Sequence, residues 1–317
     1  MPVVAREENP NIRTLMAGSR VTSEIDGDRE KAPKRKPVYP MSAERELARV
    51  FLGVAHLIKS KSKPYINRLM EIYKVWADEN VRVDARISIQ DGIEMILEEY
   101  GDEIDRSLDM GSIVKRADMA AKVARNASVG DWKKLVGSVV KEDISEPYYV
   151  ETMEDLLNKW VGESVSKISS LPREYLAKIH DIIIWGYNTH QPLINVYRKI
   201  EAATGATRSQ ARMIARDQMG TLNCRMTKHE HDSLGVTHYI WVTRRDSRVR
   251  DCHREFDGKV FSWNNPPAEW YVTVSKGIKY TGRYCNPGEA YMCRCTAKPV
   301  FDMDKVQDMV RQQRFSK

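Results

Sequence analysis

The sequence predicts an α+β fold, with a mainly helical N-terminal part and a small β-containing C-terminal module packed on a long helix. Apolar residues recur at helical spacing from about Ser42 to about residue 234. From residue 236 onward, short runs rich in β-branched and aromatic residues replace that pattern. The predicted parts are a basic N-terminal arm, a helical domain, a C-terminal domain and a tail, at residues 1–40, 41–170, 171–300 and 301–317.

Composition limits the class of protein. The 51 Lys and Arg exceed the 44 Asp and Glu by seven, an excess that favours anionic partners such as nucleic acid without requiring them. No apolar run approaches the roughly 20 residues that cross a bilayer, and the N-terminus lacks a signal-sequence pattern, so no membrane partner is expected. Five cysteines, an odd number, argue against a secreted disulfide scaffold. We expect a protein of the cytosol, or of a particle assembled there.

Residues 1–40 combine proline, glycine and charges of both signs, and contain the basic string KAPKRKP at 31–37. Without apolar periodicity, such a segment cannot bury enough surface to order itself. We therefore expect an arm that is free in isolation. The alternative is an arm that becomes ordered on DNA or on a neighbouring subunit.

The helical part is predicted to begin at an N-cap, Ser42, and to be divided by turn and cap residues. Further helices are expected at about 64–80, 88–102, 111–126, 130–141, 150–168 and 173–201. Their predicted breaks lie at Pro64, Asp84, Gly111, Gly130 and Pro147, with another near Pro192. A long helix at 207–234 should follow, starting at the capping box Thr207 and Gln210 and stopping at Gly235.

Residues 236–300 are predicted to form a small β-containing module. Residues 237–243 and 259–263 have strand-like composition, and Asp257-Gly258 precedes the second run as a turn. Pro266-Pro267 and Asn286-Pro287-Gly288 should stiffen a long loop that leads to a Cys-x-Cys strand. We expect these proline and glycine residues to be architectural.

Several strings in this half of the chain occur together in a specific order. They are ARMIARDQMGTLN at 211–223, LGVTHYIWVTRRDSRVRDCHREFDGKVFSW at 234–263, Pro266-Pro267, NPGEAYMCRC at 286–295, and Ala297-Lys298-Pro299. Each string alone is common, but their order and spacing are specific. Over about Trp160 to Phe301, the chain resembles the phage Mu F-like minor head (phage head morphogenesis) family. The motif residues are Trp241, Asp246, Arg250, His253, Asp257, Gly258, Pro287, Gly288, Cys293, Arg294 and Cys295.

The resemblance implies a structural minor capsid protein of a tailed phage rather than an enzyme. It implies few copies at the portal vertex of the virion, assembly in the host cytoplasm, and roles in head assembly and in DNA packaging or ejection. The implied partners are the portal protein, the major capsid or scaffold protein, and packaged double-stranded DNA. Members that carry a toxin have it after the Cys-x-Cys motif; about 20 residues follow Cys295 here, so we expect the head protein alone.

Basic side chains are the candidate contacts to phosphates or to an acidic partner. The candidates are Lys34, Arg35, Lys36, Arg244, Arg245, Arg248 and Arg250. An internal role is the alternative for two of them. Arg248 or Arg250 could instead tie the module together by pairing with Asp257 or Glu289.

A structural zinc ion is the candidate cofactor, because His253 and four of the five cysteines fall in the last quarter of the chain. The candidate ligands are His253, Cys285, Cys293 and Cys295, with Cys252 as a competitor. In the family pattern the resemblance implies only His253 and the Cys-x-Cys pair, which leaves three ligands. Two alternatives remain open: reduced buried thiols beside a hydrogen-bonded histidine, and a disulfide formed in the mature particle.

Two functions from other classes also remain open. One is an enzyme, either a metal-dependent nuclease or a cysteine hydrolase that uses His253 with Cys252 or Cys293. The sequence lacks a helix-borne carboxylate pair and a Gly-x-x-x-x-Gly-Lys phosphate loop, which disfavours it. The other is a sequence-independent DNA-binding protein, whose affinity should fall steeply with salt.

Overall fold

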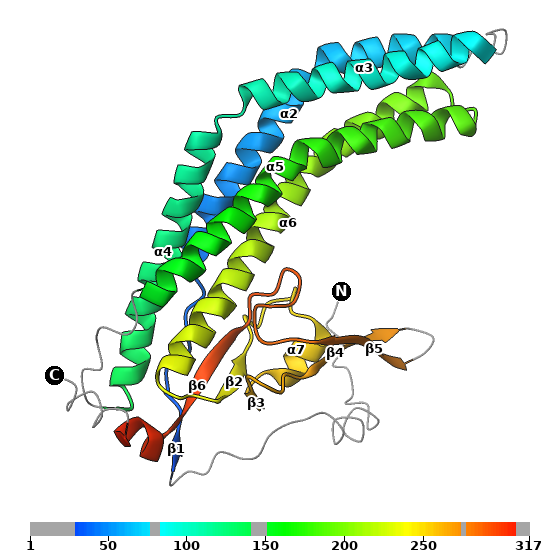
Figure 1. The fold of residues 1–317 in the computed structure, drawn as a ribbon. Helices are drawn as coiled ribbons and strands as arrows, with labels where there is room; N and C mark the ends of the chain where they lie inside the picture. The colour runs from blue at the N-terminus through cyan, green and yellow to red at the C-terminus, as the bar shows by residue number, and fades with distance from the viewer. Residues whose placement is uncertain (1–28, 77–82, 141–150, 274–276, 309–317) are drawn as a thin grey trace. The chain divides into compact units, whose positions relative to one another are not determined.

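The computed structural model describes residues 29–76, 83–140, 151–273 and 277–308 (Figure 1). The fold is α+β, as predicted: long helices account for most of the chain, and small antiparallel sheets lie near its C-terminus. The chain divides into two compact units. The helical unit comprises residues 41–122 and 157–218, and the sheet unit comprises the described parts of 1–40, 123–156 and 219–317.

Five long helices supply the helical unit, and the last three of them also contribute residues to the sheet unit. The five are α2 (Met41–Trp76), α3 (Val83–Ser107), α4 (Met110–Gly137), α5 (Glu151–Asn188) and α6 (Leu193–Ser233). Within the helical unit, the apolar face of α2 is fully buried at Leu47, Phe51 and Ile58. Buried tyrosines join the helices: the Tyr100 hydroxyl donates to the Ile58 carbonyl, and its ring packs edge-on against Tyr175. Interlocking apolar faces therefore stabilise this unit.

The sheet unit contains two small antiparallel sheets and a short helix. Its elements are β1 (Glu30–Lys31), β2 (His238–Val242), α7 (Asp251–Phe256), β3 (Val260–Ser262), β4 (Ala268–Thr273), β5 (Gly277–Tyr284) and β6 (Thr296–Asp302). One sheet has the strand order β1-β6-β2-β3, and the other is the β4–β5 hairpin. In the central strand, Tyr239 lies opposite Phe261 on one side and Pro299 on the other.

Two apolar clusters form the interior of the sheet unit. In β2, Tyr239 and Trp241 are two residues apart and therefore share a face, where they meet Phe256, Phe261 and several buried cysteines. A second cluster joins α4 to the end of α6 and to β6. Its members are Trp132, Val136, Val140, Leu234, Val236, Phe301 and Val306. Residues far apart in the sequence thus share one core.

Several predicted helix breaks are wrong. Helix α2 continues through Pro64, α4 continues through Gly130, and α5 joins the helix predicted at 150–168 to the first part of the one predicted at 173–201. The apolar stripe continues beyond Pro64 with the buried Ile66 and Leu69, and this tertiary packing outweighs the local cost of the proline. The breaks near Asp84, Gly111 and Pro192 are confirmed by the helix ends, whereas Pro147 lies outside the described residues.

The long helix begins earlier than predicted. Helix α6 starts at Leu193 rather than at residue 207, so Thr207 is not an N-cap. Its hydroxyl donates to the Ala203 carbonyl within the helix. Buried Val196 and Ile200 extend the apolar face toward the N-terminus, which explains why the helix does not stop at the apparent capping box.

The two predicted strands of the module are confirmed as β2 and β3, and Gly258 takes the positive φ of +84° that its turn requires. Three details are corrected. Helix α7 was not predicted, and the supposed long loop after Pro267 contains the β4–β5 hairpin. Cys293 and Cys295 lie in the irregular segment between a turn and β6 rather than on a strand.

The N-terminal arm was expected to be free, but residues 29–40 are ordered in the structure. Residues 1–28 lie outside the described range. Strand β1 pairs with β6, with Lys31 opposite Phe301. Asp131 of α4 accepts hydrogen bonds from the Arg35 side chain at 2.7 Å and from the Val38 backbone N–H at 2.8 Å. Strand β6 and the Asp131 carboxylate thus supply hydrogen-bond partners for this segment, and the composition of the segment alone does not predict them.

Across the described residues, none of the helices is both long enough and apolar enough to cross a membrane.

Candidate functional site

Helix α7 positions His253 in the interior of the sheet unit. A turn stabilised by Asp246, whose carboxylate accepts the Arg248 backbone N–H at 3.0 Å, precedes the helix. The helix then buries Cys252, His253 and Phe256. The His253 ring lies 5.0 Å from the Trp241 ring, centroid to centroid, and the residue is 2% exposed.

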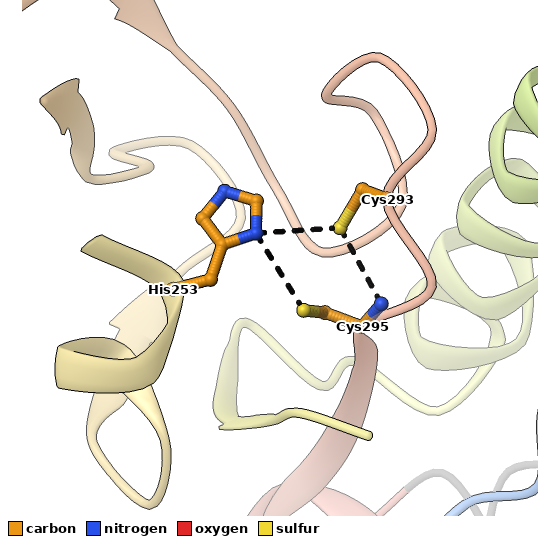
Figure 2. A group of neighbouring side chains, drawn as sticks. All are labelled: His253, Cys293 and Cys295. Atoms are coloured by element: carbon orange, nitrogen blue, oxygen red, sulfur yellow. Dashed lines mark hydrogen bonds between the residues drawn. The ribbon is translucent and has the colours of Figure 1, made fainter. Parts of the chain in front are cut away.

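The Cys-x-Cys segment reaches the same place from the other side. Met292 takes a positive φ of 57°, and the Cys293 backbone N–H donates to the Ala290 carbonyl at 2.8 Å. Figure 2 shows that both sulfurs point toward the same ring nitrogen: His253 Nδ1 lies 3.6 Å from Cys293 Sγ and 3.6 Å from Cys295 Sγ. The Cys295 backbone N–H also faces Cys293 Sγ at 3.4 Å.

Glu269 of β4 holds the opposite edge of the imidazole. His253 Nε2 lies 3.1 Å from Glu269 Oε1, and the Arg250 guanidinium lies 3.0 Å from the same oxygen. Arg250 also donates to the Tyr291 carbonyl. The Arg250–Glu269 pair therefore links the start of α7, strand β4 and the loop before the cysteines, and it orients the His253 ring.

Hydrogen bonding favours the thiolate form of Cys293 and opposes the loss of a proton from His253. The pKa of the Cys293 thiol falls well below its ordinary value because Cys295 donates a hydrogen bond to its sulfur and His253 does the same; the pKa of Cys295 rises correspondingly. Burial lowers the pKa of His253, but hydrogen bonds with Cys293 and Glu269 outweigh burial and raise it. The hydrogen bond from His253 lowers the pKa of Glu269.

A further donor faces the cysteine pair. The Trp241 indole N–H is buried and lacks a hydrogen-bond acceptor among the described residues. It lies close enough to the Cys295 sulfur to lower the pKa of that thiol, although the hydrogen bond with Cys293 dominates there. An indole N–H can only donate, so this position favours negative charge on the sulfur.

The structure brings together three of the four predicted zinc ligands. His253, Cys293 and Cys295 offer ligand atoms that all lie within 4.8 Å of one another. Cys285 is buried in the same aromatic core but is not part of this group. Cys252 instead groups with Glu269 on the other side of the His253 ring. The five cysteines are all free thiols.

Most of the predicted phosphate-contacting arginines have carboxylate partners. Arg35 pairs with Asp131, Arg245 with Asp257, Arg248 with Asp246, and Arg250 with Glu269. Arg250 thus makes an internal tie of the predicted kind, but its partner is Glu269 rather than Asp257 or Glu289. Lys34, Lys36 and Arg244 are exposed. Burial lowers the pKa of Lys298, and the nearby charge of Lys36 lowers it further.

Other motif residues build the frame around the cysteines. A Cβ at Gly220 of α6 would lie 2.6 Å from the Cys293 carbonyl oxygen, and one at Gly288 would lie 2.7 Å from the Gly220 carbonyl oxygen. Helix α6 and the Cys-x-Cys loop therefore touch through their backbones. Asp257 accepts the Thr243 backbone N–H at 2.8 Å and fixes the turn beside α7.

Sequence reasoning did not predict the contacts of Glu269, Gly220 or Asn286, although Gly220 and Asn286 fall within the motif strings. Asn286 accepts the Tyr239 hydroxyl at 2.9 Å, and its own backbone N–H donates to the Glu289 carboxylate. For Glu269 a signal existed: it lies in a run of aromatic and β-branched residues that is typical of a strand, where a carboxylate is unusual. Gly220 was a signal too, because a glycine inside a helix indicates a close backbone approach.

Comparison with known proteins agrees with the motif pattern. Residues 178–298 match the family described as Phage Mu protein F like protein. The chain is similar to an uncharacterized protein of Haemophilus influenzae, with 29% identity over 146 residues; the match spans 46% of this chain and 30% of that relative. No solved structure matches significantly. The resemblance to the family is thereby confirmed: this chain contains a phage Mu F-like region at residues 178–298.

Proposed function

We propose that this chain is a minor head protein of a tailed phage, with a structural role in head assembly at the portal vertex. It would enter the virion in few copies after synthesis in the host cytoplasm. Its principal partner would be the portal protein, with the major capsid or scaffold protein as a further neighbour. Roles in DNA packaging or ejection would follow from this position.

The match of residues 178–298 to the Phage Mu protein F-like family carries this proposal. The motif residues in that region have packing roles that suit a structural protein: Arg250 ties three segments together through Glu269, and Asp257 fixes a turn. A cysteine hydrolase would need an accessible nucleophile, yet Cys293 is 5% exposed and His253 is 2% exposed. Burial of these groups supports a structural role over an enzymatic one.

The test is co-expression of the full chain with the portal protein encoded by the same phage, followed by affinity capture and size-exclusion chromatography. The portal of an unrelated phage serves as the control partner. We expect a stable complex with the cognate portal alone. Mass spectrometry of purified particles should also detect the chain at low copy number.

Particles made without the gene provide the second half of this test. We expect defective or misassembled heads that are restored by the wild-type gene. A chain that neither binds the cognate portal nor is found in purified particles would refute the proposal. Cleavage of DNA by the purified chain with a divalent metal would instead favour the nuclease alternative.

A second candidate function is sequence-independent contact with packaged DNA. Lys36 lies near enough to Lys298 for its charge to lower the pKa of Lys298. Lys34 and Lys36 are both exposed, and clustered positive charge at a surface suits phosphate contact. This function is compatible with the head role, because a protein at the portal vertex is near the DNA.

The DNA test compares the binding affinity of the chain for duplex DNA at several salt concentrations. The double variant Lys34→Gln, Lys36→Gln should weaken binding and reduce the salt slope by about one for each lysine that binds a phosphate in the wild type. Lys122→Gln is the matched control, since Lys122 pairs with Asp118 on α4. Binding that does not change with salt would count against this function.

A further inference from the structure

We propose that His253 Nδ1 and the sulfurs of Cys293 and Cys295 bind one zinc ion, and that Glu269 orients the histidine from its other ring nitrogen. This site differs from the set expected from the sequence, because Cys285 is excluded and a carboxylate takes a supporting position. The inference is independent of the head role and holds whether or not the chain binds a portal.

The distances between the ligand atoms carry the proposal. Zinc binds thiolate sulfur at about 2.3 Å and imidazole nitrogen at about 2.0–2.1 Å, so tetrahedral angles place the two atoms about 3.6 Å apart. His253 Nδ1 lies 3.6 Å from Cys293 Sγ and also 3.6 Å from Cys295 Sγ. Figure 2 shows both sulfurs directed at that one nitrogen. Both nitrogen–sulfur distances therefore have the length that a tetrahedral zinc ion requires, and the two sulfurs lie within 4.8 Å of each other.

The surroundings match those of a metal-bound histidine. Such a histidine commonly donates its second ring N–H to a carboxylate, which fixes the tautomer and the ring orientation. Glu269 Oε1 is placed for this at 3.1 Å from Nε2. The Cys295 backbone N–H faces the Cys293 sulfur, and the buried Trp241 indole N–H lacks another acceptor among the described residues. These donors stabilise thiolates.

The alternative metal position, on the Nε2 side of the ring, is disfavoured. Cys252, His253 and Glu269 could also offer three ligand atoms. The Arg250 guanidinium, however, lies 3.0 Å from the Glu269 oxygen that would bind the ion. A fixed positive charge there opposes a cation, so the Nδ1 side is preferred.

Donor type selects the metal. Two thiolates and one imidazole suit zinc and disfavour magnesium and calcium, which prefer oxygen ligands. Among the described residues, three potential ligand atoms lie together on the Nδ1 side of the ring, one each from His253, Cys293 and Cys295. Water completes a zinc site with three protein ligands. The ion would connect α7 to the segment that leads into β6, and so would hold the sheet unit together from within.

The experiment uses the full chain, purified through a tag without histidines and dialysed against metal-free buffer. Elemental analysis should find about one zinc ion per chain. Removal of zinc with a chelator should lower the melting temperature, and zinc, but not magnesium, should restore it. Replacement by cobalt(II) should produce a sulfur-to-cobalt charge-transfer band and the visible absorption typical of tetrahedral cobalt.

Variants assign the ligands. Cys293→Ser and Cys295→Ser should each abolish stoichiometric zinc. Cys285→Ser and Cys224→Ser are the matched controls, because these cysteines are equally buried but lie outside the ligand group; both should retain the ion. Glu269→Gln should retain zinc with roughly 10–100-fold weaker affinity, since it removes an orienting carboxylate and no ligand.

Two results would overturn the inference: wild-type chain that contains only trace zinc and gives no cobalt–thiolate band, or loss of zinc from Cys285→Ser as complete as from Cys293→Ser. The cobalt spectrum is recorded on the wild type, so it decides the question even if the cysteine variants fail to fold. None of these zinc measurements requires a portal protein.

Discussion

His231 is a buried histidine whose environment keeps it neutral. Its Nδ1 accepts the Trp263 indole N–H at 2.9 Å, and its ring stacks against Trp132. Burial lowers the pKa of His231 to about 3, and the positive charge of Lys228 adds to that effect. The histidine serves as a hydrogen-bond acceptor inside the core rather than as a ligand.

This environment predicts acid sensitivity. In the unfolded chain His231 takes up a proton as the pH falls through about 6.5, but in the folded chain it stays neutral until about 3. The stability that His231 contributes is therefore complete above pH 6.5 and is lost as the pH falls toward 3, by about 1.4 kcal/mol per pH unit. Chemical denaturation between pH 7 and pH 4 measures this slope.

The control for this prediction is His231→Asn, whose amide oxygen can accept the Trp263 indole N–H but does not titrate. The difference in unfolding free energy between wild type and variant should shrink as the pH falls. A difference that stays constant between pH 7 and pH 4 would show that His231 is protonated in the folded state or is not buried.

At the level of the element, helix α6 and the Cys-x-Cys loop make a close contact through Gly220. A Cβ there would lie 2.6 Å from the Cys293 carbonyl oxygen and 3.2 Å from that of Gly288. Gly220→Ala should therefore destabilise the protein by about 1–3 kcal/mol, despite the higher helix propensity of alanine. Thermal and urea unfolding test the sign of this change.

Gly205 gives a matched control in the same helix. A Cβ at Gly205 meets nothing within 4 Å, so Gly205→Ala should stabilise the protein by about 0.5–1 kcal/mol. The two substitutions are chemically identical and should have opposite signs. Equal stabilisation by both would mean that α6 does not approach the loop as closely as described.

Strand β1 and the segment after it depend on Asp131 of α4. Its carboxylate accepts both the Arg35 side chain and the Val38 backbone N–H. Asp131→Ala should release residues 29–40 from the sheet unit and cost about 1–3 kcal/mol, because a charged group and a backbone donor lose their partner. Amide hydrogen exchange in residues 29–40 is the direct measurement.

Asp118→Ala on the same helix is the control for that experiment. Asp118 makes an exposed ion pair with Lys122, and such pairs contribute little to stability. Exchange in residues 29–40 should not change in this variant. Slow exchange in Asp131→Ala, equal to that of the wild type, would show that β1 pairing alone holds the segment.

At the scale of the whole molecule, the region that matches the family shares its core with residues outside the match. The second core cluster of the sheet unit takes Trp132 and Val136 from α4 and Val306 from beyond the match. A fragment of residues 178–298 lacks these side chains and should not fold cooperatively. Near-ultraviolet circular dichroism should show weak tertiary signal, with the full chain as the control.

A second variant makes this prediction independent of truncation. Trp132→Ala in the full chain should cost about 3–5 kcal/mol, because it removes a large side chain from the core shared with Phe301 and His231. A fragment that melts with a sharp transition, together with a mild effect of Trp132→Ala, would show that the family region is self-sufficient.

The sequence by itself determined the fold class, the change from helical to strand periodicity, and the strands at 238–242 and 260–262. Its motif strings identified the family region, and residue chemistry selected His253, Cys285, Cys293 and Cys295 as candidate ligands. These features are local: they follow from spacing, from turn residues such as Gly258, or from the types of side chain, and they need no knowledge of distant contacts.

Tertiary structure decided the rest, because it depends on which distant segments meet. Because their apolar faces are buried, α2 continues through Pro64 and α6 begins as early as Leu193. The segment before Met41 is ordered by pairing with a sheet edge and by a hydrogen bond to Asp131. Only the folded chain separates Cys285 from His253 Nδ1 and places Glu269 on its opposite edge. Spacing along a chain indicates possible ligands, whereas the three-dimensional packing of α7, β4 and the Cys-x-Cys loop selects among them.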